Sequence, residues 1–254
     1  MSFAHLDGRI YLFWFLILAH FIGDFPLQTD LVFKIKVKYS WGVLLHSGIV
    51  TLCSFLAALP YLDNYYVVIA IILFVFIFHT VVDKLKMVVD RKTKTNPFSF
   101  IIDQVLHFIG AYLVAFVPPG INEIKLHPFI PSFITPGAQI RFAIFISALI
   151  AVTYGMLFLN FTWKVWLFPN WKPSFPRGLD RWAEYFERAI ICILSAHGGY
   201  AYWVIPFVAV IRGIRVFEYG EERPIFAFDV LLGIIEAVAV GSLLKYLLNY
   251  YKYI

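Results

Sequence analysis

The stretch that decides the fold is residues 65–86, YYVVIAIILFVFIFHTVVDKLK. From Tyr65 to Phe78 it carries no charged residue, and about 20 mostly apolar residues are enough to cross a bilayer as a helix. The stretch then reaches His79 and Asp83, which are four positions apart and therefore share one helical face. It predicts a membrane-spanning helix that carries a polar pair near one end.

The whole chain has the same character as this stretch. It has 254 residues, of which 61% are hydrophobic and 15% charged, and its mean hydropathy is +0.78. Soluble domains are closer to half apolar and a quarter charged. The predicted fold class is therefore an all-α, polytopic transmembrane helix bundle. The expected spans are seven, at roughly 9–29, 42–60, 65–86, 98–117, 140–161, 187–211 and 225–247.

The distribution of basic residues predicts the orientation. With the N-terminus outside and seven spans, fifteen of the 21 lysines and arginines fall on one set of loops, which the positive-inside rule places in the cytoplasm. The C-terminus is then cytoplasmic. The net charge of +5 fits basic loops facing anionic lipid, and we expect no nucleic-acid partner. The expected parts are a four-span core (1–117), an outer Pro-rich loop (118–138) and a three-span half (139–254) with a cytoplasmic interfacial segment (161–186).

Polar clusters interrupt each of the first four spans. Ionisable groups inside a bilayer cost on the order of 2.5–3.5 kcal/mol each at mid-depth, so chance is a poor explanation for them. The predicted orientation places all four clusters at similar depth, near the cytoplasmic ends of the spans. Their members are His20, Asp24 and Gln28; His46; His79 and Asp83; and Asp103, Gln104 and His107.

Histidine and aspartate together are the usual ligands of a metal site. The number of candidates suffices for one or two divalent ions, and zinc, manganese or iron suits these ligands better than copper, because no cysteine or methionine cluster accompanies them. Cys53 and Cys192 lie in apolar stretches and are expected to pack as small hydrophobes. The alternative is that the histidines only bond neighbouring helices. The candidate metal ligands are His20, Asp24, His46, His79, Asp83, Asp103 and His107.

Basic and amide side chains near the same surface are candidates for substrate binding. Lys86 and Arg188 suit an anionic group such as phosphate, although both could equally serve as topology signals. For Lys36 we favour the latter interpretation, in which its ammonium reaches the lipid headgroups. His127 is expected to be a solvated surface residue. The candidate substrate-binding residues are Gln28, Lys86, Gln104 and Arg188.

Taken in order, these motifs resemble a known family. The succession HxxxDFxxQ at 20–28, His46, HxxxDxxK at 79–86 and DQxxH at 103–107 is similar to an uncharacterised prokaryotic membrane-protein family, domain of unknown function 3307. Glu187 and Arg188 match a Glu-Arg pair of its longer members. The resemblance implies that the clusters form one shared site in a prokaryotic inner (plasma) membrane. It supplies no activity.

Three functions remain open from the sequence. The first is a membrane-embedded metal-dependent hydrolase that acts on a lipid-linked or amphiphilic, phosphorylated substrate, with membrane lipid as its surroundings and Asp24 or Asp103 as general base. The second is a metal-ion or proton transporter or channel, which requires polar residues that continue to the outer face. The third is a structural or assembly subunit, in which the clusters serve packing alone.

Overall fold

The computed structural model describes residues 7–93, 95–171, 178–214 and 223–253. Within these ranges the chain is helical and contains no strand, which confirms the all-α prediction. The main helices are α1 (Gly8–Asp24), α2 (Asp30–Lys38), α3 (Gly42–Ala57), α4 (Tyr65–Ala70), η2 (Ile71–Ile77), α5 (Phe78–Thr93), α6 (Pro97–Phe116), α7 (Pro136–Ile150), η3 (Ala151–Gly155), α8 (Met156–Leu167), α9 (Gly178–His197), α10 (Ile205–Gly213) and α11 (Arg223–Tyr250).

Local sequence signals set the ends of the helices that carry the polar clusters. The Asp7 carboxylate caps α1 by accepting from the first backbone amides. The helix ends at Asp24, two residues before Pro26, which cannot continue a regular helix. Asn96 caps α6, which opens with Pro97. These signals place Asp24 at the last turn of one helix and the Asp103–His107 pair in the second and third turns of another.

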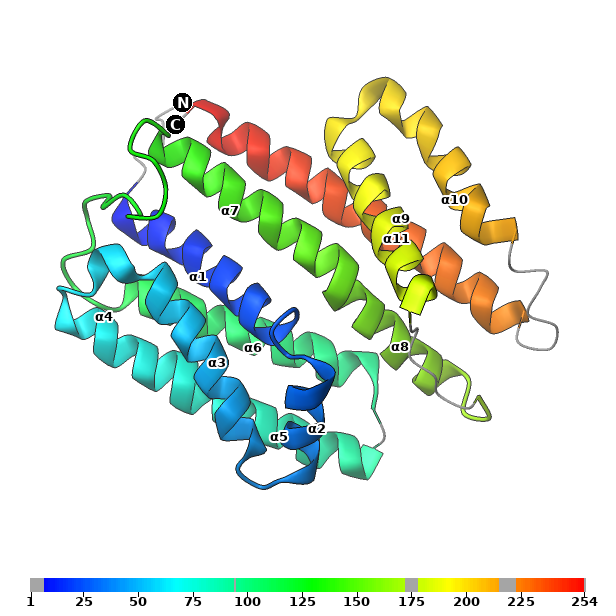
Figure 1. Ribbon diagram of the computed structural model, residues 1–254, viewed down its shortest axis with the longest axis horizontal. Coiled ribbons are helices and arrows are strands. Elements are labelled where there is room, and N and C mark those ends of the chain that lie inside the picture. The colour runs from blue at the N-terminus through cyan, green and yellow to red at the C-terminus, as the bar shows by residue number, and fades with distance from the viewer. Residues whose placement is uncertain (1–6, 94, 172–177, 215–222, 254) are drawn as a thin grey trace.

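Among the described residues, four helices are long and apolar enough to cross a membrane. The predicted spans 9–29 and 42–60 correspond to the shorter helices α1, with 17 residues, and α3, with 16. Both pack against the longer helices in one bundle (Figure 1). The four long helices are Tyr65–Thr93, which joins α4, η2 and α5, then Pro97–Phe116, Pro136–Leu167, which joins α7, η3 and α8, and Arg223–Tyr250.

The predicted span at 187–211 is wrong as a single helix. The chain forms α9 and α10 instead, which run in opposite directions and are joined by a reversal (Figure 1). The backbone at Gly198 and Gly199 has φ of +76° and +59°, a region in which side chains other than glycine are strained. The Gly-Gly pair therefore ends α9 and turns the chain.

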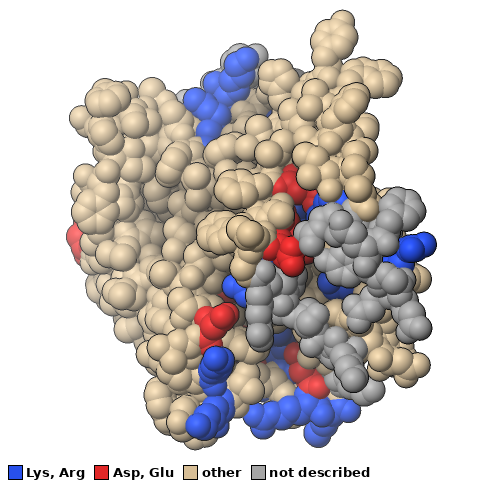
Figure 2. Space-filling view, turned by 45° about the vertical axis from the view of Figure 1, so that its right-hand side comes forward, with Lys and Arg blue, Asp and Glu red and all other residues tan. Residues whose placement is uncertain are grey.

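Because of this reversal, the C-terminus lies at the same end of the bundle as the N-terminus. Trp14 in α1 donates from Nε1 to the Tyr251 hydroxyl at 3.0 Å, and Arg141 in α7 donates to the Tyr251 carbonyl at 2.7 Å. Both ends of the described chain lie at one end of the bundle (Figure 1), so the structure does not confirm the prediction of termini on opposite sides of the membrane. We call this the terminal end, and the other, which carries α2, the α2 end. Lys and Arg side chains gather at the lower end of Figure 2.

Residues 118–135 of the predicted loop 118–138 are irregular and lie over the terminal end of the bundle, and its last three residues begin α7. His127 in this segment is buried, contrary to our expectation of a solvated side chain. Its ring stacks on Phe15, its Nε2 lies 2.9 Å from the Leu56 carbonyl, and its backbone amide donates to the Tyr11 hydroxyl. The segment therefore closes the bundle with its own small polar network.

Candidate metal centre

The four polar clusters meet inside the bundle of α1, α3, α5 and α6. Close packing at Gly110 allows this, because a Cβ at that position of α6 would lie 2.8 Å from the Phe74 carbonyl oxygen in η2. Every candidate metal ligand is buried, with at most 7% of its surface exposed. These residues are His20, Asp24, His46, His79, Asp83, Asp103 and His107. Buried ionisable groups gathered in this way need partners or a bound ion.

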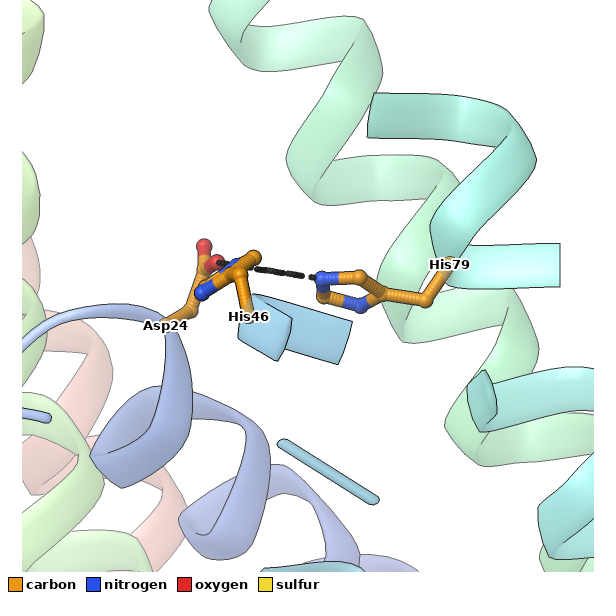
Figure 3. Close-up of side chains that lie close together, drawn as sticks. All are labelled: Asp24, His46 and His79. Atoms are coloured by element: carbon orange, nitrogen blue, oxygen red, sulfur yellow. Dashed lines mark hydrogen bonds and ion pairs between the residues drawn. The ribbon is translucent and has the colours of Figure 1, made fainter. Parts of the chain in front are cut away.

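Asp24, His46 and His79 form the tightest part of the cluster (Figure 3). His46 Nε2 lies 2.9 Å from Asp24 Oδ1 and 3.3 Å from His79 Nε2. The third side of the triangle, from His79 Nε2 to Asp24 Oδ1, is 4.0 Å. Three helices thus aim one potential ligand atom each at a common point.

These distances fit a metal ion. Zinc bonds to histidine and carboxylate are about 2.0–2.2 Å long, so ligand atoms of a tetrahedral site are separated by about 3.3–3.5 Å. The three separations span that value, and a point equidistant from the three atoms lies ~2.0 Å from each. The donor set of nitrogen and carboxylate oxygen suits zinc, manganese or iron. The residues present therefore fit a divalent ion.

Asp83 and His107 form a second group that overlaps the first, because both groups include His79. Asp83 Oδ2 lies 3.4 Å from His79 Nε2, and Asp83 Oδ1 lies 3.9 Å from His107 Nε2. The rings of His79 and His107 are stacked with their centres 3.8 Å apart. A ring nitrogen has one lone pair and binds one ion. The shared Nε2 of His79 therefore favours a single ion over two.

Gln104 connects the remaining members of the cluster. Its Nε2 donates to Asp24 Oδ2 at 2.9 Å and to Asp103 Oδ2 at 3.3 Å, while its Oε1 lies 3.3 Å from His20 Nε2. Asp103 in turn lies 3.4 Å from His107 Nε2. Such outer hydrogen bonds orient metal ligands and fix their tautomers. Gln104, predicted to bind substrate, is thus placed to hold Asp24.

The structure contradicts our expectation that the Lys36 ammonium reaches the lipid headgroups. It is 9% exposed, and its Nζ lies 2.8 Å from Asp83 Oδ2 and 3.2 Å from the Gln28 carbonyl oxygen that accepts from it. Burial alone would lower the pKa of Lys36, but the carboxylates of Asp83 and Asp24 raise it above its ordinary value. Lys36 is therefore a cation inside the site, carried by α2.

The other two predicted substrate-binding residues have different partners. Lys86 lies one turn beyond Asp83 and pairs with Asp90 at 3.6 Å. Arg188 is 1% exposed and pairs with Glu236 at 3.1 Å in the C-terminal half of the chain. The structure brings Gln28 to the cluster through Lys36, but it gives Arg188 no contact there.

A second buried ionic network joins α8, α9, α10 and α11. Arg212 is its centre and contacts Glu184 at 2.8 Å, Glu187 at 3.2 Å and also Asp229. Lys164 approaches Asp229 at 2.8 Å. The helical spacing of Glu184, Glu187 and Arg188 was the available signal for this network.

The fold and the buried cluster define an all-helical protein with apolar helices of spanning length and His/Asp groups able to hold a metal ion. Residues 12–126 match the model of a family described as "Protein of unknown function (DUF3307)". This match confirms the resemblance to that family drawn from the motifs. No curated protein and no solved structure matches the chain.

Proposed function

We propose that this protein is a membrane-embedded, metal-dependent hydrolase of lipid-linked or amphiphilic phosphorylated substrates in a prokaryotic inner membrane. The observation that carries the proposal is the triangle of Asp24 Oδ1, His46 Nε2 and His79 Nε2. It offers three protein ligands, the number used by catalytic zinc sites. The ion would supply Lewis-acid activation of water and of a phosphoryl oxygen.

The chain's own residues supply the remaining roles. Asp24 holds the ion, so Asp103 is the better general base of the two aspartates we considered, and the Gln104 amide orients it at 3.3 Å. Lys86 is proposed to meet the anionic group at the α2 end of α5. The amphipathic helix α2 exposes Leu31 and Phe33 beside its lysines, which suits a helix at the lipid surface.

The placement of polar residues favours this function over transport. On the side of the cluster that faces the terminal end, a cavity of about 10 Å³ is lined by His20, His79 and His107 and by apolar side chains that include Leu16 and Val75. That volume is close to what one water needs. The network of Tyr11, Gln139 and His127 lies beyond the apolar layer. Beyond the histidines, the lining of this cavity offers a transported ion only the hydroxyl of Ser54, so transport is the second candidate.

We propose the orientation of the chain in the membrane from the fact that both termini lie at the same end of the bundle. Lys34, Lys38 and the basic residues that end α5 lie at the α2 end, whereas Lys125 and Lys252 lie at the terminal end. The positive-inside rule then makes the α2 end cytoplasmic and both termini external. The metal centre would lie near the cytoplasmic surface, as the motifs predict.

Metal analysis of the detergent-purified protein tests the proposal. We expect one equivalent of zinc, manganese or iron in the wild type and none in His79→Ala/Asp83→Ala. His197→Ala, which removes an exposed histidine at the end of α9, should keep the metal. The loaded protein should then hydrolyse amphiphilic phosphoesters, and the double variant should not. A folded wild type that takes up no metal after reloading would refute the proposal.

A further inference from the structure

Asp83 lies close to two of the three proposed ligand atoms and is therefore a candidate fourth ligand of the same ion. Its Oδ2 is 3.6 Å from His46 Nε2 and 3.4 Å from His79 Nε2, the separations expected between ligands of one tetrahedral ion. With Asp83 the protein would supply four ligands, as in closed structural sites. With three protein ligands the fourth position stays open, as in catalytic sites. Whether Asp83 binds the ion therefore decides between a closed structural site and an open catalytic site.

The Lys36 ammonium forms an ion pair with Asp83 Oδ2 at 2.8 Å and also donates a hydrogen bond to the side-chain carbonyl oxygen of Gln28. The helix that carries it is fixed by its backbone. A Cβ at Gly42 of α3 would lie 2.1 Å from the Ile35 carbonyl oxygen, so α2 and the start of α3 are in direct backbone contact. Lys36 is therefore placed by the fold rather than by a chance side-chain conformation.

We propose that Lys36 is a positioning residue that keeps Asp83 out of the coordination sphere and so leaves the fourth position of the metal open to water or substrate. The proposal rests on the proposed function, because it concerns the same ion. An oxygen paired with an ammonium is a poorer metal ligand, since the ion must displace that charge from a buried site. Lys36 acts through Asp83 and not on the substrate itself.

Manganese-loaded protein tests this without any assay of activity. Water proton relaxation reports whether bound Mn²⁺ keeps an exchangeable inner-sphere water. We expect such a water in the wild type, its loss in Lys36→Met, and Mn²⁺ binding about tenfold tighter in that variant, because outer contacts shift metal affinity by roughly 10–100-fold. Lys36→Arg should retain the water. The matched control is Lys34→Met on the exposed side of α2, which should behave as the wild type.

A double variant identifies the ligand that closes the site. Lys36→Met/Asp83→Asn should regain the exchangeable water, because the fourth protein ligand is gone. If Lys36→Met does not fold, Lys36→Gln removes the same charge and should also lose the water. If Lys36→Met or Lys36→Gln folds, binds Mn²⁺ with the wild-type affinity and keeps the exchangeable inner-sphere water, the proposal for Lys36 is overturned. A folded wild type that binds none of Mn²⁺, Zn²⁺ and Fe²⁺ would instead refute the proposed function.

Discussion

At the scale of single residues, Gln104 offers the sharpest test of how the centre is held. One side chain donates to both Asp24 and Asp103 and faces His20, so it links the cluster on α1 to the cluster on α6. We expect Gln104→Leu to lower metal affinity by roughly 10–100-fold, because the Asp24 carboxylate loses its orienting donor. Competition with a metal-sensitive dye would measure the change.

The control for this prediction is Gln139→Leu. Gln139 is more deeply buried than Gln104, but it contacts Tyr11 in the network near the terminal end. It should affect stability and leave metal affinity unchanged. Equal losses of metal in the two variants would mean that the effect of Gln104 is general destabilisation rather than orientation of Asp24.

The residues of the candidate site could be foreseen because each pair is local. His20 and Asp24, His79 and Asp83, and Asp103 and His107 are each four apart, and helical periodicity alone puts each pair on one face. Lys36 could not be foreseen in the same way. Its role depends on how α2 folds back over the bundle, and no local pattern distinguishes a buried lysine from one that reaches the headgroups.

At the scale of elements, the Gly198–Gly199 reversal decides whether residues 187–211 form one helix or two. We expect Gly198→Ala to lower the free energy of unfolding by at least about 1 kcal/mol, because alanine is strained at φ of +76°. A Cβ there would also lie 2.1 Å from Lys245 Nζ, which would have to move. Thermal unfolding in detergent would measure the loss.

Gly213→Ala is the matched control, because a Cβ at Gly213 meets no atom within 4 Å and its φ is not positive. It should be neutral or slightly stabilising. If both variants unfold at the wild-type temperature, the reversal does not depend on the left-handed backbone at Gly198. Hydropathy alone could not predict this turn, since the apolar run continues through the two glycines.

At the scale of the molecule, two buried polar centres occupy different halves of the bundle. The His/Asp centre lies within the family match at 12–126, and the network around Arg212 lies outside it. Removing one partner of a buried ion pair typically costs about 3–5 kcal/mol, so a network of this kind specifies how its helices pack. We infer that the C-terminal network fixes α9 and α10 against α11, while the chemistry resides in the first half.

The orientation of the whole chain can be tested by labelling. In a background without Cys53 and Cys192, single cysteines at Lys125, Lys252 and Lys34 would be exposed to a membrane-impermeant maleimide. Lys125→Cys and Lys252→Cys should react in intact cells, because both positions lie at the terminal end. Lys34→Cys in α2 should react only after permeabilisation.

The outcome for Lys252→Cys separates the two topologies. Seven spans would place this position on the side opposite to Lys125, whereas the contacts of Tyr251 with Trp14 and Arg141 place it on the same side. Labelling of Lys252→Cys together with Lys34→Cys, and apart from Lys125→Cys, would contradict the folded arrangement. Labelling together with Lys125→Cys would place the metal centre near the cytoplasmic face, as the proposed function requires.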